Sequence, residues 1–157
     1  MTSETHYNTP MPDITSDMRE LIALFASHKV RFALCGGFAV AYYGFIRATM
    51  DIDLLVYPSL ENARRIMQAL HDFGFGNAGI DASAFSRPGT AITLGEQPNQ
   101  IDLLTSMSTE DADSVFRNIE FATLWSMQVP VVGKHALLRA KKESSRPRDR
   151  IDYEELA

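Results

Sequence analysis

Two aspartates one residue apart, Asp51 and Asp53, are the residues in this sequence best suited to chemistry. The apolar residues of 52–56 are typical of a buried strand, and the two-residue period of a strand puts both carboxylates on one face, about 7 Å apart. At that separation two like charges repel each other by roughly 2 kcal/mol. A divalent cation converts the repulsion into binding, and ligands that are all oxygen suit Mg²⁺ or Mn²⁺. The pair therefore predicts a metal site on a strand.

A glycine pair, Gly36 and Gly37, precedes the aspartates. An expected strand over 31–34 leads into the pair and a short apolar helix follows it, so backbone N–H groups lie at a helix start. Such groups bind anions, phosphate among them. Carboxylates for a metal and a cradle for phosphate within one supersecondary unit indicate phosphoryl-transfer chemistry.

A third carboxylate, Asp102, lies among apolar residues of an expected strand over 100–105, which a turn-rich segment separates from another strand over 90–94. A carboxylate in such surroundings is costly unless it is paired or bound to metal. If this strand lies beside that of Asp51 and Asp53, Asp102 completes a three-carboxylate site. The alternative is an ordinary aspartate on an edge strand that faces water.

The pattern resembles the nucleotidyltransferases of the DNA polymerase beta-like superfamily, which have a Gly-Gly or Gly-Ser turn, an Asp-x-Asp strand and a third carboxylate on a neighbouring strand. Arg47 and Thr49, as Arg-x-Thr before the aspartates, are most similar to small bacterial members linked to toxin–antitoxin and abortive-infection systems. The resemblance covers about 30–156. It implies an α/β (α+β) fold, with a small mixed β-sheet flanked by helices, and a Mg²⁺-dependent enzyme that uses a nucleoside triphosphate.

The resemblance also implies nucleotide contacts near the C-terminus, where the family has a lysine at the end of a helix followed by Arg-x-x-Asp or similar. Lys141, Arg148 and Asp149 match that segment, and Lys141 borders the buried face of the expected helix 134–143. Each has a plainer interpretation. Lys141 is then a solvated cation at a helix end, Arg148 and Asp149 form a local ion pair, and Arg47 is a surface cation before a strand.

Length and composition favour one domain, expected over 16–157 behind a flexible arm over 1–15. The chain shows no apolar run long enough for a membrane span and no signal-peptide pattern, and its one cysteine fits a reducing compartment, so we expect a cytoplasmic protein. The formal net charge of −5 argues against a general nucleic-acid binder. Seven of the fifteen basic residues nevertheless lie within 134–150, and such a segment can receive a polyanion locally.

Further elements follow from periodicity and caps. Ser16 or Asp17 is expected to cap a first helix, and Ser59 a second over 60–73. Strands are expected over 119–124 and 127–132, where Pro130 predicts an edge strand.

Two motifs are interpreted as look-alikes. The G-x-G-x-x-G of 74–79 follows a helix instead of a strand, so it is not a dinucleotide fingerprint. Asp111 and Asp113 form a second Asp-x-Asp, but their setting is that of acids capping a helix.

The leading hypothesis is metal-dependent transfer of a nucleoside monophosphate from a nucleoside triphosphate to an acceptor hydroxyl on tRNA or protein, with a cognate toxin or antitoxin as a further partner and no membrane. Asp51, Asp53 and Asp102 are the expected catalytic and metal-binding residues. The expected nucleotide-binding residues are Gly36, Gly37, Arg47, Thr49, Lys141, Arg148 and Asp149. The alternative is an inactive nucleotidyltransferase-like module that binds a partner protein or a nucleotide.

Overall fold

A computed structural model describes residues 11–76 and 79–157. The helices of this part of the chain are α2 (Ser16–Ser27), α3 (Gly36–Tyr42), α4 (Leu60–Leu70), α5 (Ala112–Arg117), α6 (Lys134–Glu143) and α7 (Pro147–Leu156), with a π-helical turn at His71–Phe75 and a 3₁₀ helix at Ala82–Ser86. The strands are β1 (Phe32–Cys35), β2 (Ile52–Val56), β3 (Ala91–Leu94), β4 (Ile101–Leu104), β5 (Glu120–Leu124) and β6 (Met127–Val131).

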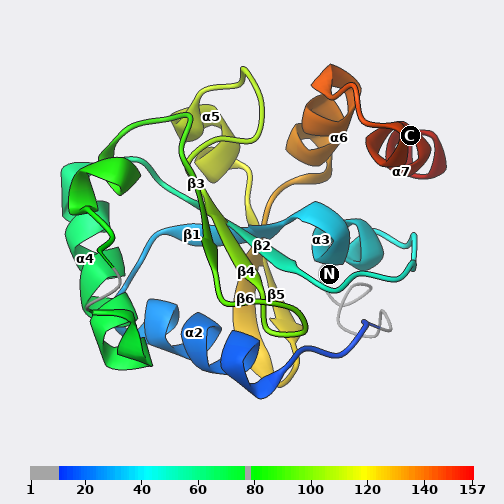
Figure 1. Ribbon diagram of the computed structural model, residues 1–157. Coiled ribbons are helices and arrows are strands. Elements are labelled where there is room, and N and C mark those ends of the chain that lie inside the picture. The colour runs from blue at the N-terminus through cyan, green and yellow to red at the C-terminus, as the bar shows by residue number, and fades with distance from the viewer. Residues whose placement is uncertain (1–10, 77–78) are drawn as a thin grey trace.

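The six strands form one mixed sheet in the order β3-β4-β2-β1-β6-β5. The neighbours β2 and β4 are parallel, as are β1 and β6, and the other three pairs are antiparallel. With helices packed around it (Figure 1), this is the α/β fold with a small mixed sheet that the sequence predicts.

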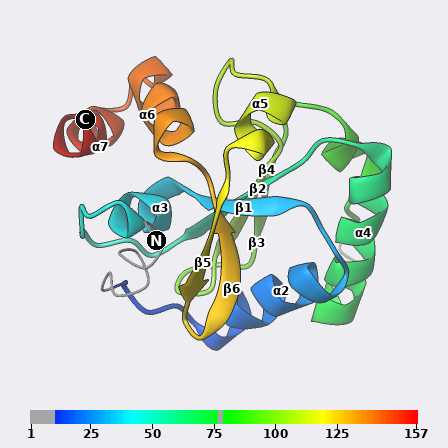
Figure 2. The same cartoon turned by 180° about the vertical axis from the view of Figure 1, so that it is seen from behind.

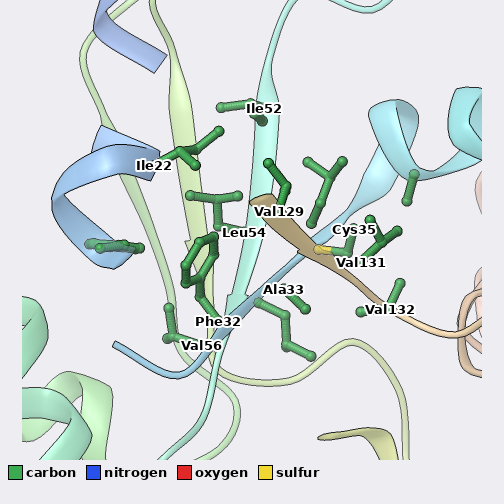
Figure 3. Packing of buried hydrophobic residues seen from close by; sticks show 14 of the residues in the cluster. Ile22, Phe32, Ala33, Cys35, Ile52, Leu54, Val56, Val129, Val131 and Val132 are labelled. Carbon is green, nitrogen blue, oxygen red and sulfur yellow. The ribbon is translucent and has the colours of Figure 1, made fainter. Parts of the chain in front are cut away.

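The two faces of β2 differ at Asp53. Ile52, Leu54 and Val56 are fully buried, and Ile22 of α2 packs against this face (Figure 3). Asp53 points the other way and is only half-buried. The period of two thus anchors β2 in the core through its apolar side chains and leaves the carboxylate on the opposite face.

The helices occupy two separate regions of the molecule. Helix α4 lies at one end, beside α2, whereas α6 and α7 lie at the other, and α6 lies between α5 and α7 in both views (Figures 1 and 2). Within residues 11–76 and 79–157, no helix has the length and apolar character needed to cross a membrane.

Residues 1–10 of the predicted arm over 1–15 lie outside the described part of the chain. The remainder packs against the domain: Met11 and Ile14 contact the core, and Trp125 Nε1 donates to the Pro12 carbonyl at 2.9 Å. Thr15 caps α2 by accepting a hydrogen bond from a backbone N–H, so the expectation of a cap at Ser16 or Asp17 was one residue late or more. The predicted cap at Ser59 is confirmed.

The prediction that Pro130 marks an edge strand is wrong. Pro130 belongs to β6, which lies between β1 and β5. A proline is tolerated there because the pairing of β6 with β1 is limited to Leu34 and Val131, so Pro130 lies outside that ladder.

Candidate active site

The sheet brings the three predicted carboxylates together. Strands β2 and β4 are parallel neighbours in which Asp53 is paired with Asp102, and Asp51 directly precedes β2. Because directly paired residues on parallel strands point to the same face, both carboxylates lie on the face of the sheet opposite to Ile52 and Leu54. The expectation that the strand of Asp102 lies beside that of Asp53 is confirmed.

One cavity of about 360 Å³ lies over this face, and we call it the carboxylate cavity. Its walls include every residue that the sequence nominated for the site: Gly36, Gly37, Arg47, Thr49, Asp51, Asp53, Asp102, Lys141, Arg148 and Asp149. These residues come from five separate segments of the chain, so only the fold gathers them.

Each of the three carboxylates has a different environment. Gln97 Nε2 donates to Asp51 Oδ1 at 3.2 Å, and Asp102 Oδ1 accepts from Thr93 Oγ1 at 2.7 Å and from Gln100 Nε2 at 3.2 Å. Burial, then the negative charges of Asp102 and Asp51, together raise the pKa of Asp53 to about 7, although the positive charge of Lys141 opposes the shift. The surroundings of Asp53 therefore provide too little positive charge to stabilise its ionised form.

A divalent cation fits this donor set in chemistry, because the carboxylates offer only oxygen ligands and their negative charge is incompletely compensated. As they stand, however, no three acidic, histidine or cysteine side chains in the described part of the chain are gathered closely enough to hold a metal ion. The amide and hydroxyl groups of Gln97, Gln100 and Thr93 hold Asp51 and Asp102 in their present orientations. Metal binding thus requires the three carboxylates to move closer together.

The glycine pair forms the wall of the cavity next to Asp53. Gly36 has φ +66°, and a Cβ at this position would lie 1.9 Å from Asp53 Oδ2. A Cβ on Gly37 would lie 2.7 Å from Thr49 Oγ1. Glycine is required at 36 both by the left-handed backbone and by the close approach of the carboxylate. The pair therefore allows the start of α3 and the Asp53 side chain to share one wall.

Lys141 reaches inward, as its place on α6 predicts, and is buried. Its Nζ lies 2.9 Å from Asp149 Oδ1 and 3.0 Å from Asp152 Oδ2. Arg47 binds the same Asp152 with two parallel hydrogen bonds of 2.8 Å. We call Arg47, Lys141, Asp149 and Asp152 the ion-pair cluster; it joins the segment before β2 to both C-terminal helices.

The carboxylates of this cluster have pKa values shifted in the opposite direction from that of Asp53. Burial alone would raise the pKa of Asp149, but hydrogen bonds from Ser144 and Lys141 outweigh it and lower the pKa to about 2. Burial opposes the shift at Asp152 too, where Arg47 and Lys141 lower the pKa. Both carboxylates are therefore held ionised by adjacent cations.

The alternative of a local ion pair between Arg148 and Asp149 is not realised. Asp149 Oδ2 instead accepts from Ser144 Oγ at 2.6 Å and from Arg146 Nε at 3.0 Å. Arg148 is exposed on the rim of the carboxylate cavity. Arg47, in turn, is not the plain surface cation of the alternative interpretation, because its guanidinium is largely covered and bonded to Asp152.

Sequence reasoning passed over three residues of this site: Asp152, Arg146 and Gln97. Asp152 could have been found, because it follows Asp149 by three residues and thus shares a helix face with it. Arg146 and Gln97 carry no such signal, since one is exposed at a helix start and the other lies in a loop.

The two look-alike motifs have the places expected of them. Asp111 caps α5 by accepting from the Ser114 N–H at 2.9 Å, and Asp113 lies in the first turn, where it accepts a hydrogen bond from the Tyr57 hydroxyl. Gly74 has φ +102° at the end of the helical segment, and residues 77–78 of the G-x-G-x-x-G lie outside the described part of the chain.

Comparison with known proteins rests on structure alone, since no family model and no curated protein matches the sequence. A nucleotidyltransferase candidate from Thermotoga maritima superimposes with a TM-score of 0.56 at 15% identity, over 88% of this chain and 86% of its own. The lincosamide antibiotic adenylyltransferase LnuA, with lincomycin bound, gives 0.54 at 16% identity, over 92% of this chain and 98% of its own. The fold is that of the nucleotidyltransferases. At these identities the likeness shows the nucleotidyltransferase fold and leaves the chemistry to the residues themselves.

Proposed function

We propose that this protein is a metal-dependent nucleotidyltransferase, which moves a nucleoside monophosphate from a nucleoside triphosphate to an acceptor hydroxyl. The observation that carries the proposal is the gathering of all ten nominated residues around one cavity, on a fold shared with an adenylyltransferase. The cavity has acidic side chains on the sheet and cations on the helices, as a metal-bound triphosphate requires.

In this proposal Asp51, Asp53 and Asp102 hold Mg²⁺ or Mn²⁺. When bound, the metal supplies positive charge that offsets the negative charge of the triphosphate and of the transition state. Asp53 is central to this set because burial and the negative charges of both other carboxylates raise its pKa, so a cation would stabilise its ionised form.

The remaining residues act on the substrate directly. Backbone N–H groups of Gly36 and Gly37 bind the β- and γ-phosphates, with Lys141 and Arg148 nearby to offset their charge. Asp102 accepts the proton of the attacking hydroxyl. The hydroxyl oxygen forms a bond to the α-phosphorus, the bond from that phosphorus to the bridging oxygen breaks, and pyrophosphate leaves.

The ion-pair cluster supports this chemistry by position. Because Arg47 and Lys141 are both bonded to Asp152, neither is free to collapse onto the three catalytic carboxylates. Thr49 donates to the Asp51 carbonyl at 3.3 Å and so holds the turn that leads into β2. The cluster thus keeps cations beside the cavity without neutralising its acidic side.

The acceptor and the cellular setting belong to the same proposal. The exposed basic side chains of α6 and α7, Lys142, Arg148 and Arg150 among them, favour a polyanionic acceptor such as tRNA over a neutral one. The Arg-x-Thr of Arg47 and Thr49 supports a role in a toxin–antitoxin or phage-defence system. Co-purification with the product of the neighbouring gene tests that setting.

The decisive experiment incubates the protein with each labelled nucleoside triphosphate, Mg²⁺, and total tRNA or cell protein. We expect transfer of label that requires Mg²⁺ and is lost in Asp53→Asn, whereas Asp113→Asn, a carboxylate outside the cavity, keeps it. Transfer that survives Asp53→Asn rejects the assignment.

An inactive nucleotide-binding module is the second candidate, and one observation favours it: no three acidic side chains are gathered closely enough for a metal within the described residues. It predicts binding of Mg²⁺ and nucleotide without turnover on any acceptor. The same transfer assay decides between the two.

A further inference from the structure

A second cavity, also of about 360 Å³, adjoins the carboxylate cavity, and most of its lining residues have no role in the chemistry described above. It lies between α6 and the segment that leaves β4, and we call it the α6 cavity. The residues that line this cavity and not the carboxylate cavity are the apolar Cys35, Leu104, Met107, Leu137 and Ala140 and the polar Ser106, Glu143 and Ser144.

The two cavities share a wall made of Gly36, Asp53, Lys141, Arg146 and Asp149. A ligand that fills the carboxylate cavity can therefore extend past Lys141 into the α6 cavity. The two cavities are thus adjacent, and the residues that line the α6 cavity alone are apolar except for Ser106, Glu143 and Ser144.

The apolar part of the α6 cavity is unsuited to phosphate. Leu104, Met107, Leu137 and Ala140 present hydrocarbon or thioether groups to it. The carboxylate of Glu143 repels an anion. That carboxylate is fixed in place, since its oxygens accept from the Thr109 N–H at 2.8 Å and from Arg139 Nε at 3.1 Å. Apolar walls with a few fixed acceptors and hydroxyl groups suit a flat, uncharged ring that carries N–H donors.

The proposed catalytic residues that line each cavity indicate whether this ring belongs to the nucleotide donor or to the acceptor. Asp102, which receives the proton of the attacking hydroxyl, lines only the carboxylate cavity. Gly36 and Lys141, which face the phosphates, line both cavities. The α6 cavity is thus contiguous with the phosphate-binding wall and separate from the place of the acceptor.

We infer that the α6 cavity binds the nucleobase and ribose of the donor nucleoside triphosphate, with the base against Leu104, Met107 and Ala140. The inference rests on the proposed function, since it needs the triphosphate in the carboxylate cavity. It assigns selection among nucleotides to α6 and to the segment after β4.

The test fills the α6 cavity and leaves the carboxylate cavity intact. Ala140 is half-buried on α6, so Ala140→Phe directs a ring into the space, and Ala140→Leu is a milder version should the first fail to fold. His135→Phe is the matched control, because His135 is exposed on the same helix and lines neither cavity. Thermal melting checks that each variant is folded.

Calorimetry with Mg²⁺ then compares two ligands, the preferred nucleoside triphosphate and inorganic tripolyphosphate. We expect Ala140→Phe to weaken nucleotide binding at least tenfold and tripolyphosphate binding less than twofold, and His135→Phe to change neither. Equal weakening of both ligands, or of neither, overturns the inference, as does unchanged nucleotide binding with impaired transfer, which places the acceptor in the α6 cavity. If the unmodified protein binds neither ligand, the proposed function fails and the inference falls with it.

Discussion

Two adjacent clusters of charge, the three carboxylates of the carboxylate cavity and the ion-pair cluster, differ in how their charge is compensated. In the ion-pair cluster, Asp149 and Asp152 are each bonded to cations, and their pKa values are lowered. In the carboxylate cavity, Asp53 has two acidic neighbours, and its pKa is raised to about 7. Both clusters place carboxylates out of bulk water, but only the first supplies its own countercharge.

The difference separates structural from functional acid groups. A buried ion pair with complete partners is costly to break but does no chemistry by itself. A cluster of carboxylates that lacks a partner is destabilising in the folded protein, and such sites are retained where a ligand provides the missing charge. Breaking each cluster in turn should therefore give opposite outcomes for stability and activity.

The largest effect is expected for Asp53→Asn. This change removes the central carboxylate, so transfer should fall at least about a thousandfold, a loss of roughly 4 kcal/mol in transition-state stabilisation. The same variant should be at least as stable as the original protein at pH 8, because an amide needs no countercharge there. Steady-state transfer and urea unfolding measure the two quantities. A variant that keeps a tenth of the activity, or that is destabilised at pH 8, contradicts the contrast between the clusters.

Lys141→Met is expected to have the converse effect on stability. It leaves Asp149 and Asp152 short of a buried cation, and breaking such a pair typically costs about 3–5 kcal/mol. Urea unfolding measures the loss. Lys142→Met, one residue along and exposed, is the control and should change stability by less than about 0.5 kcal/mol. Equal stabilities for the two variants would show that the ion-pair cluster is dispensable.

The pH dependence of stability separates the clusters without a ligand. The folded-state pKa of Asp53 is raised from 3.8 to about 7, so the stability that this group contributes is complete below pH 4 and is lost as the pH rises through 7. The pKa of Asp149 is lowered to about 2, so its contribution is present above pH 4 and is lost as the pH falls through 2.

We expect Asp53→Asn to remove about 2 kcal/mol of the decline between pH 5 and 8, a figure reduced for partial exposure of the site. Asp149→Asn should lower stability at every pH above 4 and remove the part of the loss below pH 4 that comes from Asp149. Thermal unfolding from pH 2 to 9 measures both. If stability still declines between pH 5 and 8 in Asp53→Asn, the decline comes from another titrating group.

The catalytic strands could be predicted from the sequence because their signals are local. Alternation of apolar residues with Asp53 fixes which face the carboxylate takes, and the glycine pair marks the turn before it. The parallel pairing that puts Asp102 beside Asp53 was a hypothesis that depended on strand order. The structure confirms it, although whether the three residues bind metal stays a prediction.

The ion-pair cluster could not be predicted in the same way. Its central contact joins Arg47 to Asp152, which are 105 residues apart, and no periodicity connects them. Only the packing of α7 against α6 and the segment before β2 creates the pair. The wrong prediction for Pro130 has a similar cause. The local rule that proline marks an edge strand fails for β6 because its pairing with β1 is limited to Leu34 and Val131.

The smallest effect is expected at Gln97, whose amide donates to Asp51 at 3.2 Å in an exposed loop. Gln97→Ala releases Asp51 from the amide that now orients it, so the carboxylate can turn towards Asp53 and Mg²⁺ binding should tighten by up to about threefold, or less than 1 kcal/mol, with little change in stability. Calorimetry with Mg²⁺ measures this, and Gln128→Ala, an exposed glutamine on β6, is the control. If Gln97→Ala instead weakens Mg²⁺ binding tenfold, Gln97 belongs to the ligand-binding set, and the carboxylate cavity is more fully compensated than its contrast with the ion-pair cluster requires. Unchanged binding shows that Asp51 already exchanges its partner freely, which confines the missing charge to Asp53 and Asp102.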